Sequence, residues 1–172
     1  MRQILAIKVQ DEPGVLTRVA TVFSSRGFNI DSIAVGATEK LGISRIILVL
    51  TGDDLIIEQI SKQLNKLVQI IEIKNLTKKE CIERQLMLIK YKCPAGMRHF
   101  FVVGAPIVRA RIIDIGNDWM TFEVSGNDVE IDAFKMMYSN YEILELVVTG
   151  KICIEREISK FESKLENIEI SK

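Results

Sequence analysis

The stretch Gln3-Ile4-Leu5-Ala6-Ile7-Lys8-Val9, followed by Asp11-Glu12-Pro13-Gly14, decides the first step of the fold. Its odd-numbered apolar residues from Leu5 onward would share one face of a strand. The Pro-Gly pair breaks the strand, and apolar residues then recur at helical spacing until Gly27, a residue type that commonly ends helices. These apolar residues are Val15, Leu16, Val19, Val22 and Phe23. The chain therefore begins with a strand, a short loop and a helix.

The rest of the first half predicts three more strands and one more helix. Residues 29–35, 44–51 and 68–73 are short runs rich in β-branched side chains, which favour strands. Asp53 or Asp54 can start a helix between the last two runs, because an aspartate accepts hydrogen bonds from a first helical turn. The resulting order is β-α-β-β-α-β, which is the ferredoxin-like arrangement.

After the polar segment 75–80, the same order of elements repeats less regularly. The predicted strands are 84–93, 108–115, 120–125 and 144–154, and the predicted helices are 97–103 and 128–138. Residues 155–172 form a charged segment with one apolar side, which predicts a helix that either packs on its own domain or docks a partner. We therefore predict an α+β fold of two ferredoxin-like units, spanning residues 1–76 and 83–172 with the terminal helix, joined by a linker at 77–82.

Composition narrows the functional class. The chain has 172 residues, and its 23 basic and 23 acidic side chains cancel to a formal net charge of +0. A DNA-binding protein needs a positive face to displace counterions from phosphates, so the balance argues against a nucleic-acid partner.

Cysteine usage and hydropathy indicate a cytoplasmic protein. Cys81, Cys93 and Cys153 form no C-x-x-C pair, and an odd number of cysteines suits reduced thiols in a cytosol. Lys8 and Asp11 interrupt the apolar start that a signal peptide would need. The apolar run 46–50 is far below the roughly 18–20 residues that cross a bilayer, so we expect no membrane association.

No pattern of catalytic or metal-binding residues emerges. His99 is the single histidine, and no cysteine lies at ligand spacing from it. Gly150-Lys151 lacks the other residues of a phosphate-binding loop and is predicted to lie in a strand, and no G-x-G-x-x-G occurs. We expect neither a catalytic residue nor a metal site on this chain.

The loop between the first strand and the first helix has the features of an amino-acid site. A helix N-terminus offers free N–H groups and positive partial charge, so a carboxylate can bind at the N–H groups of Gly14, Val15 and Leu16. Asp11 can accept a hydrogen bond from an ammonium group. The alternative is that Asp11 caps the helix and the loop has no other role.

These residues, together with Arg26-Gly27-Phe28-Asn29-Ile30, resemble the signature of the ACT domain, a βαββαβ module that binds amino acids. Two further stretches, Gln63-Leu64-Asn65-Lys66-Leu67-Val68 and residues 82–90, make the chain similar to the small regulatory subunits of acetolactate synthase. The resemblance covers residues 1 to about 92. It implies that the first unit is an ACT domain and the second a degenerate, ACT-like C-terminal domain.

The resemblance also implies a mechanism. Members of the family bind a branched-chain amino acid, usually valine, between the ACT domains of two subunits whose sheets lie side by side. The effector-binding residues map onto Asp11, Gly14, Val15 and Leu16 of one chain and Asn29 and Ile30 across the interface. Bound effector lowers the activity of a large catalytic subunit, which the small subunit otherwise stimulates. That partner holds thiamine diphosphate, magnesium and FAD, and no cofactor is expected here.

The sequence departs from the family pattern in two places. Asp11 stands where the family often has asparagine, and Val148-Thr149-Gly150 stands where it has Arg-Thr-Gly. The sequence therefore does not predict which residues of the second half contact the catalytic subunit.

Two other functions are alternatives to this prediction. A stand-alone amino-acid sensor that regulates another enzyme or a transcription factor is one alternative. A small metabolic enzyme on the same scaffold is the other, since ferredoxin-like units host many functions.

Overall fold

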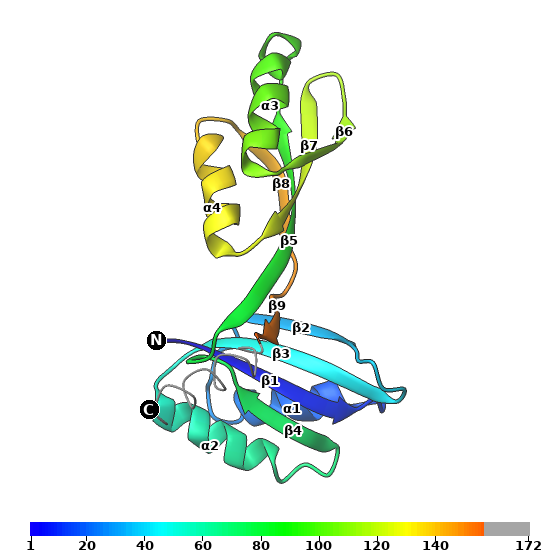
Figure 1. Ribbon diagram of the computed structural model, residues 1–172, viewed down its shortest axis with the longest axis vertical. Helices are drawn as coiled ribbons and strands as arrows, with labels where there is room; N and C mark the ends of the chain where they lie inside the picture. Colours follow the sequence, from blue (N-terminus) through cyan, green and yellow to red (C-terminus); the bar gives the residue numbers. More distant parts are fainter. Residues whose placement is uncertain (157–172) are drawn as a thin grey trace, which may run out of the picture.

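The computed structural model describes residues 1–156, which form two lobes joined by one long strand (Figure 1). The first lobe is a four-stranded antiparallel sheet in the order β2-β3-β1-β4, with α1 and α2 on one face. Its elements are β1 Arg2–Gln10, α1 Val15–Ser24, β2 Ser32–Ala37, β3 Ile43–Thr51, α2 Asp54–Leu64 and β4 Ile70–Asn75. The predicted β-α-β-β-α-β order is confirmed.

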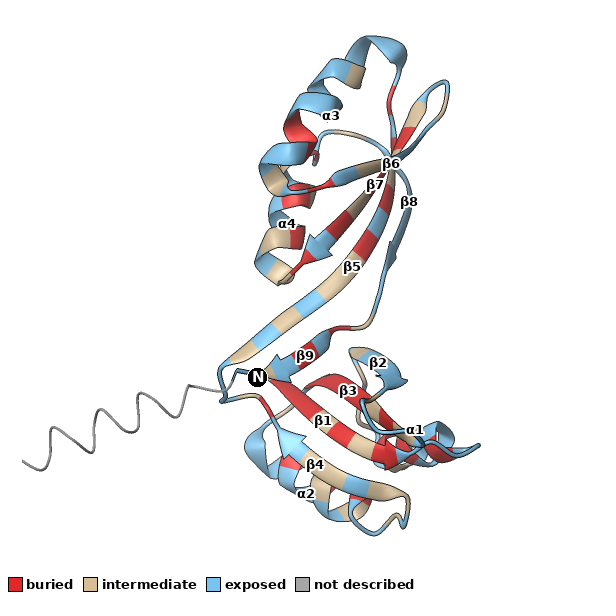
Figure 2. Cartoon of the chain, turned by 45° about the vertical axis from the view of Figure 1, so that its right-hand side comes forward, coloured by how far each residue is buried: buried red, intermediate tan, exposed pale blue. Residues whose placement is uncertain are grey.

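Alternation along β1 builds the core of this lobe. Leu5, Ile7 and Val9 are buried and face the helices, where they pack with Val19 and Phe23 of α1. Figure 2 shows buried residues along much of β1. This one-sided burial follows from the period of two along a strand and the 3.6-residue period along a helix. It fixes the register of β1, and with it the position of the loop that follows β1.

The second lobe repeats the order of the first. Its sheet has the order β6-β7-β5-β8, in which each strand occupies the place of the strand four numbers lower. Its elements are β5 Cys81–Lys92, the 3-10 turn η1 Ala95–Met97, α3 Arg98–Gly104, the 3-10 turn η2 Ala105–Val108, β6 Arg111–Ile115, β7 Trp119–Gly126, α4 Asp128–Met137 and β8 Ile143–Val148. The predicted pair of ferredoxin-like units is therefore confirmed.

Aromatic side chains fill the core of the second lobe. The rings of Phe101 and Tyr138 stack with centroids 4.8 Å apart, and the Tyr138 hydroxyl donates a hydrogen bond to the carbonyl of Phe101. Burial raises the pKa of both Tyr91 and Tyr138 to about 12, so both phenols stay neutral. Since Tyr91, Phe122 and Phe134 surround this pair, the short α3 is held mainly by aromatic packing.

Several predicted boundaries were wrong. The strand predicted at 29–35 begins only at Ser32, because Asn29 and Ile30 lie in the loop after α1. Val108 belongs to a 3-10 turn that closes at Arg109 with a positive φ of 56°, so β6 starts three residues later than predicted. Of the helix predicted at 155–172, Glu155 lies in a strand instead, and residues 157–172 lie outside the described part of the chain.

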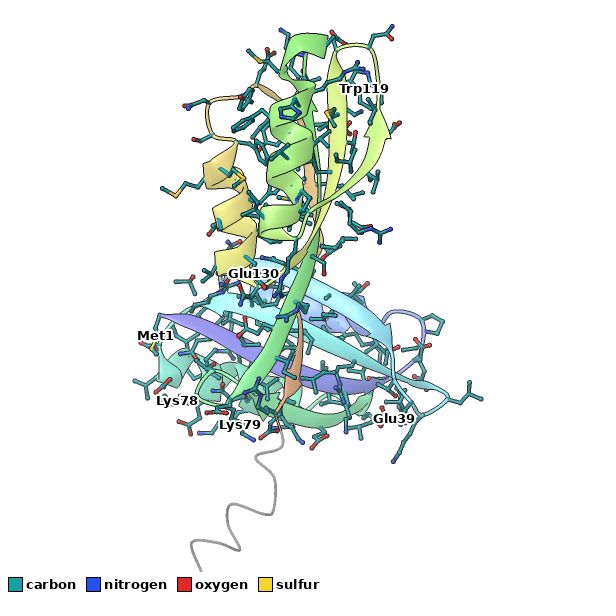
Figure 3. The ribbon with its side chains drawn as sticks, turned by 45° about the horizontal axis from the view of Figure 1, so that its top comes forward. Met1, Glu39, Lys78, Lys79, Trp119 and Glu130 are labelled. Carbon is teal, nitrogen blue, oxygen red and sulfur yellow. The ribbon has the colours of Figure 1, made fainter. Side chains whose placement is uncertain are left out.

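The single strand predicted at 144–154 is two strands. β8 ends at Val148, and β9 Ile152–Glu155 pairs instead with the first residues of β5. The β5–β9 pair lies across the face of the first sheet that the helices leave open (Figure 3). There Cys153 is buried against Ile4, Ile47 and Val49. The first sheet is thus covered on both faces, by helices on one side and partly by β5 and β9 on the other.

Gly150 was predicted to lie in a strand, but it lies in the connection between β8 and β9. Its position is explained by close packing against β2. A side-chain carbon at Gly150 would overlap the carbonyl oxygen of Ile33 in β2, so only glycine lets the two backbones approach this closely. The packing between the lobes therefore requires glycine at position 150.

We predict that Gly150→Ala lowers the free energy of unfolding by about 1–3 kcal/mol, because overpacking forces the backbone apart. Gly96→Ala is the matched control, since nothing lies within 4 Å of a side-chain carbon there and its φ is not positive. Urea denaturation of both variants measures the difference. Equal stability of the two variants would contradict the close approach at Ile33.

Candidate functional site: the loop after β1 and the edge of β2

Gly14 sets the conformation of the loop between β1 and α1. It precedes the helix with φ 82°, a left-handed conformation that glycine adopts without strain. The N–H of Val15 donates to the carbonyl of Glu12 at 3.3 Å, which closes the turn, and the Val15 side chain is buried in the core. A strand end, a glycine turn and a buried anchor together fix where α1 begins.

The start of α1 has no side-chain cap. Among the described residues, the N–H groups of Gly14 and Leu16 donate no hydrogen bond, whereas that of Val15 is used within the turn. The prediction that all three N–H groups are available is therefore wrong for Val15. Uncapped N–H groups at a helix N-terminus carry positive partial charge and suit a carboxylate.

Asp11 lies on the exposed side of the same loop. Its backbone N–H donates to the carbonyl of Gly42 at 2.9 Å, which fixes the residue beside the β2–β3 turn. Its carboxylate accepts no hydrogen bond from any described residue, so Asp11 does not cap α1. The loop thus carries one hydrogen-bond acceptor, the Asp11 carboxylate, and two N–H donors without a partner among the described residues, those of Gly14 and Leu16.

Asn29 and Ile30 lie far from this loop within one chain. Gln10, at the end of β1, pairs with Ile43 of β3, whereas Ser32, at the start of β2, pairs with Val49. Six residues of β3, or about 20 Å, therefore separate the end of β1 from the start of β2. The Asn29 amide is exposed and donates to Asp31 at 3.3 Å, and Ile30 packs partly against the core. The structure brings Asp11, Gly14, Val15 and Leu16 together but leaves Asn29 and Ile30 at the opposite end of the sheet.

The edge strand β2 is unusually apolar for a strand with one free side. Ile33 and Val35 are exposed, and Gly36 and Ala37 follow them without any charged side chain. Soluble proteins usually protect a free sheet edge with charges, prolines or bulges. An unprotected edge of this kind is suited to pairing with another strand.

A buried lysine joins this edge to the second lobe. Lys151, only 1% exposed, donates from its Nζ to Glu83 at 2.5 Å and to Asp128 at 2.8 Å. Its backbone N–H donates to the Oγ of Ser32, the first residue of β2, at 3.1 Å. Arg2 of β1 also pairs with Asp128, the first residue of α4. This lysine cluster, defined as Lys151, Glu83, Asp128 and Arg2, was not anticipated from the sequence.

The cluster fixes the charge state of Asp128. Burial by itself would raise the pKa of this carboxyl, but the hydrogen bonds and charges of Lys151 and Arg2 outweigh it and hold the pKa below its usual value. A carboxyl with a lowered pKa stabilises the folded state above its ordinary pKa of about 3.9. That contribution is lost only as the pH falls through the lowered value, so the cluster is intact at neutral pH.

Cysteine and histidine side chains act as nucleophiles, bases or metal ligands in many proteins, so their surroundings in this chain decide which of these roles they can take. Burial raises the pKa of the Cys93 thiol, and burial together with Cys81 raises that of Cys153 to about 12, so neither is an activated nucleophile. His99 is exposed on α3. Within residues 1–156 no three side chains are grouped as metal ligands, and no helix is long and apolar enough to cross a membrane.

Two family models match the chain, one in each lobe. Residues 5–72 match the ACT domain that is like that of the small subunit of AHAS, acetohydroxyacid synthase. Residues 84–157 match the small subunit of acetolactate synthase. With the βαββαβ sheet and the uncapped loop after β1, the first match defines the class: this is an ACT-domain regulatory protein.

Whole-chain comparisons extend the match to both lobes. A probable acetolactate synthase small subunit of Archaeoglobus fulgidus is 42% identical over 156 residues, which is 91% of this chain and 98% of that protein. The acetolactate synthase small subunit of Mycobacterium bovis is 40% identical over 152 residues, covering 88% and 90% of the two chains. The crystal structure of the small subunit from Thermotoga maritima superposes with a TM-score of 0.81 at 33% identity, over 91% of this chain and 98% of that one.

The chain therefore belongs to the family of acetolactate synthase small subunits, which are regulatory and non-catalytic. The second family model covers residues 84–157, the half in which Val148-Thr149-Gly150 stands where the family has Arg-Thr-Gly. The divergence in that half is thus compatible with membership.

We predict that Lys151→Met lowers the free energy of unfolding by about 1–3 kcal/mol, because it leaves Glu83 and Asp128 facing each other with one cation fewer. Lys135→Met is the control, since Lys135 pairs with Asp132 on the surface of α4. Urea denaturation at neutral pH measures both. A loss no larger than that of the control would show that the cluster does not hold the lobes together.

Proposed function

We propose that this chain stimulates the catalytic subunit of acetolactate synthase and makes it sensitive to feedback inhibition by a branched-chain amino acid, valine being the first choice. The observation that carries the proposal is the division of the predicted site. One chain holds an amide-lined loop at one end of the first sheet and Asn29 with Ile30 at the other end. Two unlike half-sites on one chain make two complete sites when two chains associate.

Antiparallel pairing of β2 with β2 of a second copy would complete the sites. In such a pair the start of one strand lies beside the end of the other. The end of β2, Ala37, pairs with Ser44, close to Gly42, which holds Asp11 by a hydrogen bond. The partner's start of β2 would thus arrive on the side of the sheet that carries Asp11 and Gly14. The exposed apolar edge of β2 supports this geometry.

The chemistry of the loop suits the two charged ends of an amino acid. A carboxylate at a helix N-terminus gains roughly 0.3–1 kcal/mol when exposed and up to about 2 when partly buried. A charge-assisted hydrogen bond from an ammonium to Asp11 adds roughly 1.5–3, and burying a valine-sized side chain another 1.5–3 kcal/mol. After the cost of immobilising the ligand, the sum supports weak to moderate affinity, which suits sensing of an abundant metabolite.

The lysine cluster supplies a route from the dimer edge to the second lobe. Ser32 begins β2 and accepts a hydrogen bond from the backbone of Lys151, whose side chain holds Asp128 at the start of α4. An effector that binds two arrangements of β2 unequally would therefore bias the position of α4 as well. Unequal binding is essential, because equal binding shifts no population.

We propose that residues 1–76 bind the effector and dimerise and that residues 83–172 form an ACT-like domain. Of the predicted linker 77–82, Cys81 and Ile82 already lie in β5. Thiamine diphosphate, magnesium and FAD would lie on the catalytic partner, and this chain would bind none of them. Lys151, Glu83 and Asp128 are engaged in structural ion pairs at the lobe junction, which fits a chain that transmits a signal.

We predict that adding this chain to the catalytic subunit raises its activity, and that valine then lowers it. Gly14→Asp should abolish the inhibition and keep the stimulation, because the new carboxylate repels that of the effector. Gly14→Asn is the matched control, since asparagine tolerates the same left-handed backbone and has the same shape without the charge. Acetolactate formation, measured with valine, leucine and isoleucine in turn, tests the proposal.

Three results would contradict it. Absence of stimulation would exclude a regulatory role toward this enzyme and favour a stand-alone sensor. Unchanged inhibition of Gly14→Asp would exclude the loop as the effector site. Equal loss of inhibition in Gly14→Asp and Gly14→Asn would assign the effect to backbone strain, which leaves the carboxylate position unsupported.

A further inference from the structure

A cavity of about 610 Å³ lies between the open face of the first sheet and the end of β9. Its floor comes from three neighbouring strands, because Lys8 of β1 pairs with Arg45 of β3 on one side and with Glu72 of β4 on the other. Its wall is β9, which crosses over this sheet (Figure 3). The small side chain of Ala6 leaves room between floor and wall.

The charges around the cavity do not balance. Four cations line it, namely Lys8, Arg45, Lys74 and Arg156, against the two carboxylates Glu72 and Glu155. Both carboxylates are already engaged: Glu72 lies 2.9 Å from Lys8 and 3.4 Å from Lys74, and Glu155 lies 2.6 Å from Lys79. The cavity therefore presents an excess of positive charge.

Among the residues that the structure describes, Arg45 and Arg156 are the two lining cations that have no ion-pair partner. Neither guanidinium forms an ion pair or a side-chain hydrogen bond with any residue in the described range 1–156. Arg45 rises from the floor, and Arg156 directly follows β9 at the wall. A guanidinium binds phosphate or carboxylate oxygens in a two-pronged geometry, so two of them lining one cavity suit an anion with several oxygens.

The remaining lining adds an apolar part. Leu76, Cys153 and Ile154 complete the wall beside the charged floor. Cavities of roughly 300–1,000 Å³ with apolar walls and a few convergent polar groups are typical of small-molecule sites. The size and lining favour a compact molecule with an anionic head over an extended macromolecular surface.

We propose that this cavity binds a small organic anion that carries phosphate or carboxylate groups, held by Arg45 and Arg156. The site is distinct from the effector loop, because Lys8 and Arg45 point from the face of the sheet opposite to α1. It links the sheet to β9, so a bound anion stabilises the packing of the two lobes. β1 runs from this floor directly into the loop at Asp11, which gives the anion a means to influence the effector site.

Thermal unfolding of the full chain tests the proposal with three probes: inorganic phosphate, pyrophosphate and citrate. Each is added at constant ionic strength with chloride as the balancing anion, because surface charges respond to salt alone. A ligand that binds only the folded state raises the melting temperature with its concentration. We expect a saturable rise with at least one probe, and calorimetry then gives its Kd.

The variant pair isolates the two arginines. Arg45→Gln combined with Arg156→Gln should weaken binding roughly tenfold or more, since each guanidinium supplies charge-assisted hydrogen bonds. Arg18→Gln combined with Arg111→Gln removes the same charge elsewhere and should bind as the unaltered chain does. A preference for phosphate or pyrophosphate over citrate identifies a phosphorylated ligand, and the reverse identifies a polycarboxylate; either supports the site.

Several outcomes overturn it. No saturable response to any probe excludes the site, and an equal response in both double variants assigns the effect to general electrolyte stabilisation. The Gly14→Asp chain should bind the probe unchanged. Loss of binding in that variant would place the anion at the start of α1 and contradict the cavity, while leaving the effector proposal intact.

Discussion

The antiparallel pairing of the first sheet determines which of the proposed effector residues one chain can bring together. It sets the loop Asp11–Leu16 at one end of the sheet and Asn29 with Ile30 at the other, about 20 Å apart along β3. No side-chain motion closes such a gap, because the core residues of β1 and α1 fix both ends. If the six residues form one site, as proposed, it requires a second chain, and the exposed apolar edge of β2 is the surface proposed to receive it.

The second lobe is coupled to this edge by backbone as well as by charge. β5 pairs with β9 over the first sheet and continues as a central strand of the second sheet, so one strand belongs to both lobes (Figure 1). Lys151 lies where the chain returns, beside Ser32 and between Glu83 and Asp128. Lone buried charges are costly, and this one is tolerated because two carboxylates neutralise it. The junction therefore connects β2 to α4 through the hydrogen bonds and ion pairs of Lys151.

The order of helices and strands could be predicted from the sequence, whereas the contacts between the two lobes could not. Periodicity predicted both βαββαβ units, because apolar alternation in β1 and the helical spacing of Val15, Val19 and Phe23 are local signals. The helix start at Asp53, which accepts a hydrogen bond from the N–H of Ile56, was equally local. The break at Gly150 and the burial of Lys151 were missed, because they depend on a contact with Ile33 and Ser32, more than a hundred residues away. The use of the Val15 N–H within its own turn was missed because the sequence gives no sign of that bond.

Mixed dimers test the central claim most directly. Gly14→Asp damages the loop, and Asn29→Asp places a charge at the other half-site with little change of shape. If each site takes one half from each chain, a mixed dimer of the two variants has one intact site and one doubly damaged site. Titration calorimetry with valine should then give one bound effector per mixed dimer and none for either variant alone. Mixed dimers that bind no effector, while the unaltered chain binds two per dimer, would contradict the shared site.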